Sequence, residues 1–207
     1  MIKNLVVRAM LSLGIVLGVA VGASVASAQS LMIGEPGYGG NGCPSGSASV
    51  TISPDQSELS ILFDQYIAEA GNTTGLPFDR KSCNLSVPVF VPQGYSVAVF
   101  KVDYRGFNAI STPTGRTQFT SEYFWAGSQG PRMARTFFGP DIQDYTATDD
   151  LLVASMVWTP CGDSLNLRVN SSITAIAGAD MGQTMITVDS ADISSGLVYH
   201  LQWRQCQ

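Results

Sequence analysis

The sequence predicts an all-β protein: an antiparallel β-sandwich of jelly-roll or Greek-key type, with two disulfides and few or no helices after a signal peptide. Three observations support this prediction. Apolar residues recur with a period of two, turn-forming residues separate these runs, and no stretch after residue 28 has the period of an amphipathic helix. About ten short strands without intervening helices are typical of a sandwich or a jelly roll.

The N-terminus has the composition of a secretory signal. Lys3 and Arg8 precede an apolar run from Ala9 to Val25, and Ala26-Ser27-Ala28 forms a small-x-small cleavage site. An uncleaved membrane anchor is the alternative, because a spanning helix needs about 20 apolar residues. The cleavage site and the glycines within the run favour removal. We therefore expect residues 1–28 to be a signal peptide and the mature protein to be secreted, either extracellular or periplasmic, with no membrane span.

Charge and length limit the class of protein further. Without Lys3 and Arg8, the chain after residue 28 holds 9 Lys and Arg against 16 Asp and Glu, a net charge of −7. Phosphate backbones repel such a chain, so we expect no nucleic-acid partner. Residues 29–46 contain five glycines between Gly34 and Gly42 and are expected to form a flexible leader. Residues 47–207 suit one sandwich domain.

The expected strands follow from the alternation in chain order. Residues 47–52 and 59–64 alternate, and residues 63–71 can instead close as a short helical turn. Two strands joined at Pro92-Gln93-Gly94 follow, and Pro88 marks an edge or a bulge in the first. In the second, Ala98, Phe100, Val102 and Tyr104 are expected to face the core, leaving Lys101, Asp103 and Arg105 solvated. Further strands are expected over 118–126, 133–138, 150–158, 165–176, 184–189 and 197–204.

All four cysteines lie after the signal, and an even count in an exported chain predicts disulfides. Cys43, Cys83, Cys161 and Cys206 allow three pairings. We favour Cys43 with Cys83 and Cys161 with Cys206, because each pair then encloses its own half of the chain. A zinc site is the alternative, but its ligands usually come as closely spaced pairs, and no two of these cysteines are closer than 40 positions.

The tetrapeptide Gly162-Asp163-Ser164-Leu165 matches a serine-esterase motif. Such an enzyme needs its serine on a strand-to-helix turn and a histidine as base. Here Ser164 leads into the alternating residues of a strand. The single histidine, His200, has Leu197 rather than an aspartate three positions earlier and is expected on the exposed face of the last strand. We therefore interpret the motif as a false positive, a turn beside Cys161 at the start of a strand.

Several short stretches together carry a family resemblance. They are Gly42-Cys43-Pro44, Pro160-Cys161-Gly162, the strand pair from Cys83 through Val102-Asp103-Tyr104-Arg105-Gly106-Phe107, and the segment from Trp203 to Cys206. From about residue 41 to 206 the chain resembles the secreted proteins grouped as domain of unknown function 4360. The resemblance implies export and a β-rich fold with disulfides. It implies no catalytic residue.

Other candidate sites are weaker. Asp180, Asp189 and Asp192 are candidate calcium ligands, although solvated turn aspartates are the simpler interpretation. Tyr123 and Trp125 share one face of a strand and are candidates for stacking on a ligand, although core packing is the simpler interpretation.

We expect a non-catalytic binding module or a structural protein of the cell envelope or extracellular space, with no cofactor and with a glycan or envelope protein as partner. The alternative is a secreted carbohydrate-active hydrolase that uses an Asp/Glu pair.

Overall fold

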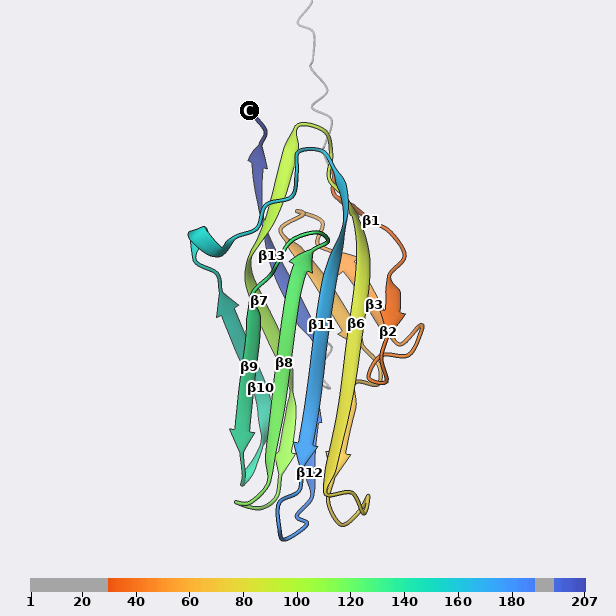
Figure 1. The fold of residues 1–207 in the computed structure, drawn as a ribbon, viewed down its shortest axis with the longest axis vertical. Coiled ribbons are helices and arrows are strands. Elements are labelled where there is room, and N and C mark those ends of the chain that lie inside the picture. The colour runs from red at the N-terminus through yellow and green to blue at the C-terminus, as the bar shows by residue number, and fades with distance from the viewer. Residues whose placement is uncertain (1–29, 189–195) are drawn as a thin grey trace, which may run out of the picture.

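The computed structural model describes residues 30–188 and 196–207, in which thirteen strands form two antiparallel sheets. The signal segment lies outside the described residues, and the predicted removal of residues 1–28 stays a prediction. We name the sheets by their position in Figure 1. The front sheet contains β1 (Met32–Ile33), β2 (Gly37–Gly39), β6 (Phe78–Phe90), β8 (Arg116–Trp125), β9 (Arg132–Phe138) and β11 (Ser164–Ile176). The back sheet contains β3 (Ala48–Ile52), β4 (Glu58–Phe63), β5 (Ile67–Ala70), β7 (Tyr95–Ile110), β10 (Asp141–Asp150), β12 (Thr184–Thr187) and β13 (Leu197–Gln205).

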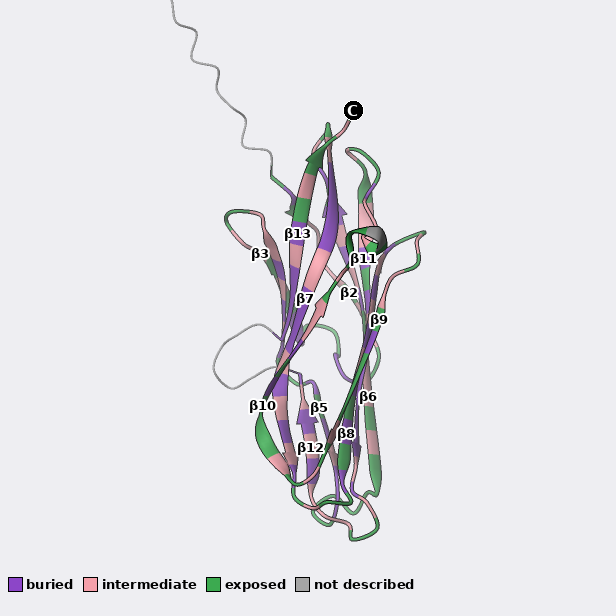
Figure 2. Ribbon diagram, turned by 90° about the vertical axis from the view of Figure 1, so that its left-hand side faces the viewer, coloured by how far each residue is buried: buried purple, intermediate pink, exposed green. Residues whose placement is uncertain are grey.

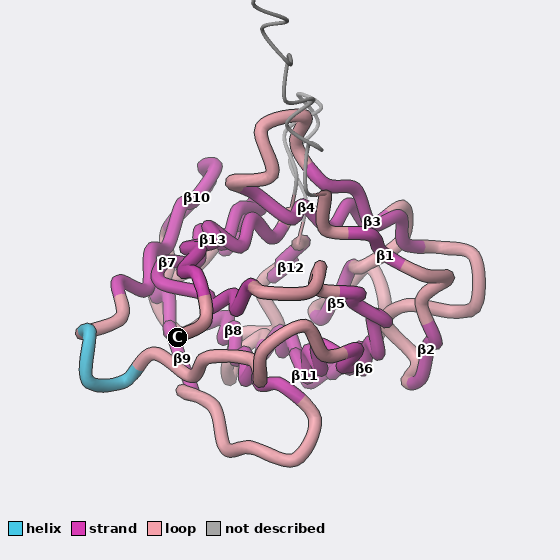
Figure 3. Tube along the Cα trace, turned by 90° about the horizontal axis from the view of Figure 1, so that it is seen from above, coloured by secondary structure: helices cyan, strands magenta, loops and turns pink. Residues whose placement is uncertain are grey.

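The strands follow a defined order within each sheet. In the front sheet β6, β11, β8 and β9 are consecutive neighbours, and β1 and β2 both pair with β6. In the back sheet the order is β3-β4-β13-β7-β12-β5, with β10 also paired to β7. Seen edge-on, the two sheets lie face to face (Figure 2). The view from above also separates the two layers (Figure 3). The predicted all-β antiparallel sandwich is confirmed.

The core lies between the sheets and follows the predicted alternation. Phe119 and Ile173 point inward from the front sheet, and Tyr104, Leu197 and Tyr199 point inward from the back sheet, all fully buried. Tyr104 packs against Phe119 with ring centroids 5.0 Å apart. Burial of each large side chain contributes about 1.5–3 kcal/mol, so the contacts between the sheets supply most of the stabilisation.

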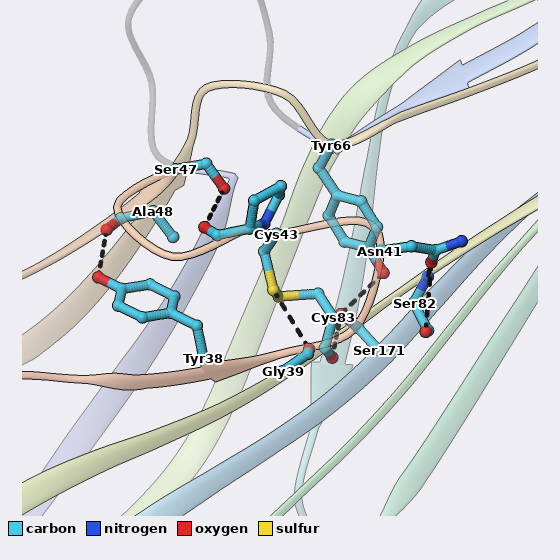
Figure 4. The surroundings of a disulfide bond; sticks show 11 residues. Tyr38, Gly39, Asn41, Cys43, Ser47, Ala48, Tyr66, Ser82, Cys83 and Ser171 are labelled. Carbon is cyan, nitrogen blue, oxygen red and sulfur yellow. Dashed lines mark hydrogen bonds between the residues drawn. A yellow bond between two sulfur atoms is a disulfide. The ribbon is translucent and has the colours of Figure 1, made fainter.

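Both favoured disulfide pairings are confirmed, and each anchors a segment that connects one sheet to the other. Cys43 follows β2 of the front sheet, precedes β3 of the back sheet, and bonds to Cys83 in the middle of β6. Cys161 precedes β11 of the front sheet and bonds to Cys206 just after β13 of the back sheet. Figure 4 shows the first bridge beside Tyr66, whose hydroxyl oxygen lies 3.0 Å from Oγ of Ser171.

The glycine-rich segment expected as a leader contributes two short strands to the front sheet. β1 pairs with β6 at Ile33 and Val89, and β2 pairs with it at Gly37 and Ser86. Pro88, which lacks a backbone donor, lies opposite the interruption between β1 and β2. The two short strands therefore cover the edge of β6 on either side of the proline.

The structure differs from the expectations in three places. Residues 63–71 form a bend and β5 rather than a helical turn. No strand spans the predicted range 150–158. Instead β10 (Asp141–Asp150) ends where that range begins, and a 3-10 turn, η1 (Val153–Ser155), follows. The sequence missed β10 because Tyr145 and Ala147 are its only buried positions.

The third error concerns which side of β7 faces the core. The pairing of β7 with β13 shifts at Phe100, where His200 opposes Lys101 and Leu201 opposes Val99. This β-bulge inserts one extra residue and reverses the alternation. Val97 and Val99 therefore belong to the core before the bulge, and Phe100, which was expected there, is only half-buried. Ala98 is buried as predicted. Beyond the bulge, Val102 and Tyr104 face inward as predicted.

Candidate functional site

The serine of the esterase-like tetrapeptide begins a strand. Gly162 adopts a left-handed conformation with φ 61° in the turn, and the Asp163 carboxylate accepts a hydrogen bond from the Ser164 backbone at 2.9 Å. β11 then continues without interruption to Ile176, and no helix follows Ser164. The predicted turn and strand start beside Cys161 are thus present. A strand start of this kind lacks the exposed elbow that a nucleophilic serine requires.

His200 lies in the other sheet, between two carboxylates. Its Nε2 lies 2.8 Å from Oδ2 of Asp103, and its Nδ1 lies 3.2 Å from Oε1 of Glu58. The side chain is on the outer face of β13, as predicted, although it is only 18% exposed. Because both ring nitrogens already contact acidic partners, the imidazole is not arranged to take a proton from Ser164.

Asp103 is buried, although the row Lys101, Asp103 and Arg105 was expected to be solvated. It is 6% exposed, and it accepts hydrogen bonds from Thr148 of the neighbouring strand β10 at 2.7 Å and from His200. Lys101 adds an ion pair at 3.3 Å. Burial alone would raise the pKa of Asp103, but the bonds from Thr148, His200 and Lys101 hold the pKa below its ordinary value. The cluster fastens three strands of the back sheet.

Of the three calcium candidates, Asp180 alone lies within the described residues. Asp180 accepts hydrogen bonds from the hydroxyls of Thr112 and Thr114 and from the backbone of Gly182, so it stabilises a turn. Asp189 and Asp192 lie outside the described residues. Within residues 30–188 and 196–207, no group of three or more His, Cys, Asp or Glu side chains could hold a metal ion.

Tyr123 and Trp125 face the core instead of solvent. They are 3% and 4% exposed, because the alternation of β8 turns them toward the back sheet. Tyr123 packs edge-on against Tyr199 at 5.4 Å, and Trp125 donates a hydrogen bond from Nε1 to the Val157 carbonyl at 3.0 Å. In this conformation neither ring offers a face to a ligand. Both rings therefore pack in the core.

The feature with the character of a binding site is the outer surface of the front sheet. A shallow hollow of about 240 Å³ lies across β6, β11, β8 and β9. Register places Asn84, Asn170, Glu122 and Arg132 in one cross-strand row. The next row holds Ser82, Ser172 and Thr120. We call the outward residues that line this hollow the polar face: Arg80, Ser82, Asn84, Thr120, Glu122, Arg132, Asn170 and Ser172.

The floor of the polar face is a short hydroxyl network. The hydroxyl oxygens of Thr120 and Ser172 lie 2.8 Å apart, and the Arg80 guanidinium donates to Ser172 at 3.3 Å. The amides of Asn84 and Asn170 oppose each other across β6 and β11. Sequence reasoning missed this site because neutral polar residues on the outward side of a strand were interpreted as solvated. The signal was that these outward positions carry hydroxyls and amides on three of the longest strands.

Fold and disulfides together define a β-sandwich with two disulfides, as suits an oxidising compartment and a secreted protein. The chain belongs to the family described as Domain of unknown function (DUF4360), whose model matches residues 29–206. An uncharacterized secreted protein of Arthroderma benhamiae is 34% identical over 169 residues, which cover 82% of this chain and 69% of that protein. Among the described residues no helix is long and apolar enough to cross a membrane.

Two solved structures show a weak overall likeness. TmCBM61 in complex with β-1,4-galactotriose has a TM-score of 0.27 and 9% identity, covering 82% of this chain and 88% of the other. The family 11 carbohydrate-binding module from Clostridium thermocellum, in complex with a β-1,3-1,4-mixed-linked tetrasaccharide, has a TM-score of 0.24 and 11% identity, covering 83% and 88%. Likenesses at this level support no inference about ligand or activity.

Proposed function

We propose that the protein is a non-catalytic, secreted binding module that holds a polysaccharide on the polar face. The observation that carries the proposal is the hollow across β6, β11, β8 and β9, whose floor consists of neutral hydroxyl and amide groups. A sugar ring presents hydroxyls that donate and accept hydrogen bonds. Ser and Thr hydroxyls and Asn amides do the same and match such a surface group by group.

The rigidity of the polar face favours binding further. Its residues lie on long paired strands whose opposite sides are locked in the core, so little ordering is required when a ligand arrives. The hollow is also open, which suits an extended polymer rather than a small enclosed molecule.

The non-catalytic part of the proposal rests on the chemistry of the described side chains. Acid-pair glycoside hydrolysis needs two carboxyl groups on either side of the bond. Glu122 is the single acidic residue among the strand positions that line the hollow. Ser164 and His200 lie in opposite sheets, and the imidazole is held by Asp103 and Glu58. Among the described residues, the hollow therefore holds no acid pair, and Ser164 and His200 form no triad.

Binding of purified mature protein to a panel of soluble polysaccharides, measured by affinity electrophoresis and calorimetry, tests the proposal. We expect the double variant Asn84→Ala/Asn170→Ala to bind roughly 5- to 150-fold more weakly, because two lost hydrogen bonds cost about 1–3 kcal/mol. Gln143→Ala, on exposed β10 of the back sheet, is the matched control and should bind normally.

Three results would count against the proposal. Absence of binding to every polysaccharide, or equal binding by the Asn84→Ala/Asn170→Ala variant, would remove the polar face as the site. Turnover of an ester or glycoside by the purified protein would contradict the non-catalytic assignment.

A further inference from the structure

The two sheets carry opposite charge although the chain as a whole is acidic. The strands of the front sheet contain six basic and two acidic residues, and those of the back sheet contain three basic and seven acidic residues. β10 alone holds four aspartates. A sandwich with this separation attracts anions to one side and repels them from the other. The net charge of the chain therefore does not describe the field at the polar face.

The basic residues of the front sheet gather on its outer surface. Arg80, Arg116, Arg132 and Arg168 all have outward register positions on β6, β8, β9 and β11, and all four are exposed. Glu122 is the one acidic residue among the outward strand positions of this sheet. The surface around the hollow therefore has an excess of positive charge.

These guanidinium groups are not used to stabilise the fold through ion pairs. Within the described residues none of the four arginines lies within ion-pair distance of a carboxylate, whereas Lys81, on the opposite side of β6, pairs with Asp79 at 3.3 Å. Of the four guanidinium groups, Arg80 alone donates a hydrogen bond within the described residues, to the Ser172 hydroxyl. The other donors are free to bind a ligand.

The choice of residue points to the kind of anion. All four outward cations are arginine, whose planar fork binds carboxylate and sulfate groups through two parallel hydrogen bonds. A surface evolved only for solubility has no need of that geometry, and it commonly mixes both signs of charge.

Arg80 and Arg132 lie at opposite corners of the hollow, three strands and four residues apart. With strands about 4.8 Å apart and a rise of about 3.4 Å per residue, their Cα atoms are roughly 20 Å apart. One sugar unit cannot reach both.

We infer that the ligand of the polar face is an anionic polysaccharide. Its carboxylate or sulfate groups bind the arginines at the corners of the hollow, and its hydroxyls bind Asn84, Asn170 and Ser172 between them. This inference rests on the proposed function and specifies its ligand. The recurring negative charge of such a polymer fits guanidinium groups that are spaced rather than clustered.

A matched pair of polymers tests the inference. Polygalacturonate and its fully methyl-esterified form share one backbone and differ in charge, and dextran sulfate with dextran provides the same comparison for sulfate. We expect at least one charged polymer to bind at least tenfold more tightly than its neutral partner at low salt, with the preference shrinking as salt rises. Carboxylate is the group recognised if polygalacturonate is preferred, and sulfate if dextran sulfate is preferred.

Variants locate the preference on the polar face. Arg80→Gln/Arg132→Gln should reduce binding of the charged polymer at least tenfold and remove most of its salt dependence. Arg105→Gln, on β7 of the back sheet, makes the same substitution on the other side of the molecule and should retain binding. Thermal unfolding midpoints of all variants should match the wild type, because Arg80 and Arg132 are exposed.

The outcomes separate the two proposals. Equal affinity for the neutral and charged forms, unchanged by Arg80→Gln/Arg132→Gln, would overturn the anionic ligand and leave the polysaccharide-binding function in place. Binding to neither form of either pair, and to no neutral polysaccharide, would remove the function itself. Equally tight binding of double-stranded DNA would also overturn the inference, because it would mean a general affinity for polyanions.

Discussion

The two disulfides close loops of nearly equal length, but one is buried and the other is partly exposed. Comparing them therefore separates the contribution of chain entropy to stability from that of packing. The cysteines are 40 residues apart in Cys43–Cys83 and 45 apart in Cys161–Cys206. Loop closure of this length restricts the unfolded chain by about 4 kcal/mol in each case. Both half-cystines of the first bridge are 1% exposed, whereas Cys161 is exposed.

We therefore predict unequal losses when each bridge is replaced by two alanines. Cys161→Ala/Cys206→Ala should lower the free energy of unfolding by about 4 kcal/mol. Cys43→Ala/Cys83→Ala should lower it by about 1–2 kcal/mol more, because two buried sulfur atoms also leave cavities in the core. Urea unfolding followed by tryptophan fluorescence measures both.

The reasoning fails if the two double variants lose equal stability or if the exposed bridge proves the more important one. If Cys43→Ala/Cys83→Ala does not fold, limited reduction of the wild-type protein replaces it. Alkylation and mass measurement should then show Cys161–Cys206 opening first, since it is the accessible bridge. Opening of Cys43–Cys83 first would refute the packing argument.

Three further predictions concern stability. Burial raises the pKa of Tyr199 well above its ordinary value, and its hydroxyl makes no hydrogen bond within the described residues, so Tyr199→Phe should change the unfolding free energy by less than about 1 kcal/mol; a larger loss would mean a hidden partner. Asp103→Asn should cost about 2 kcal/mol at pH 7. Because the pKa of Asp103 is lowered on folding, its stabilisation is present above the unfolded pKa and is lost as pH falls through the folded value. Urea midpoints of the variant and wild type should therefore converge in strong acid, and a constant gap would contradict this. Gly106→Ala should lower the melting temperature, with a cost of about 1–3 kcal/mol, because a Cβ there would overlap the Thr187 carbonyl and the Tyr145 hydroxyl; an unchanged melting curve would be inconsistent with that close approach.

The long inner strands could be predicted from the sequence because their alternation records burial directly. Residues 165–176 and 197–204 correspond closely to β11 and β13, and the turn at Cys161 follows from its glycine and aspartate. β10 escaped prediction because an edge strand buries few side chains and leaves a mostly polar sequence. The bulge at Phe100 escaped because one inserted residue reverses the alternation without changing composition.

The candidate site was harder to predict from the sequence than the fold. Asn84, Asn170 and Arg132 are far apart in the chain, and only the register of four strands places them in one row. Tyr123 and Trp125 were candidates for stacking on a ligand with core packing as the simpler account, and the alternation of β8 places both in the core. Charge separation between the sheets is likewise a property of strand order, which total charge conceals.

The placement of the bridges also fixes how the protein would respond to tension. A force applied between Cys43 and Cys206 passes through each disulfide and bypasses the segments they enclose, which are 40 and 45 residues long. At about 3.4 Å per extended residue, roughly 290 Å of chain cannot lengthen while the bonds are intact. Only the stretch from Cys83 to Cys161, which contains β7 to β10, can be drawn out, so the oxidised protein would yield less than half the extension of its reduced form.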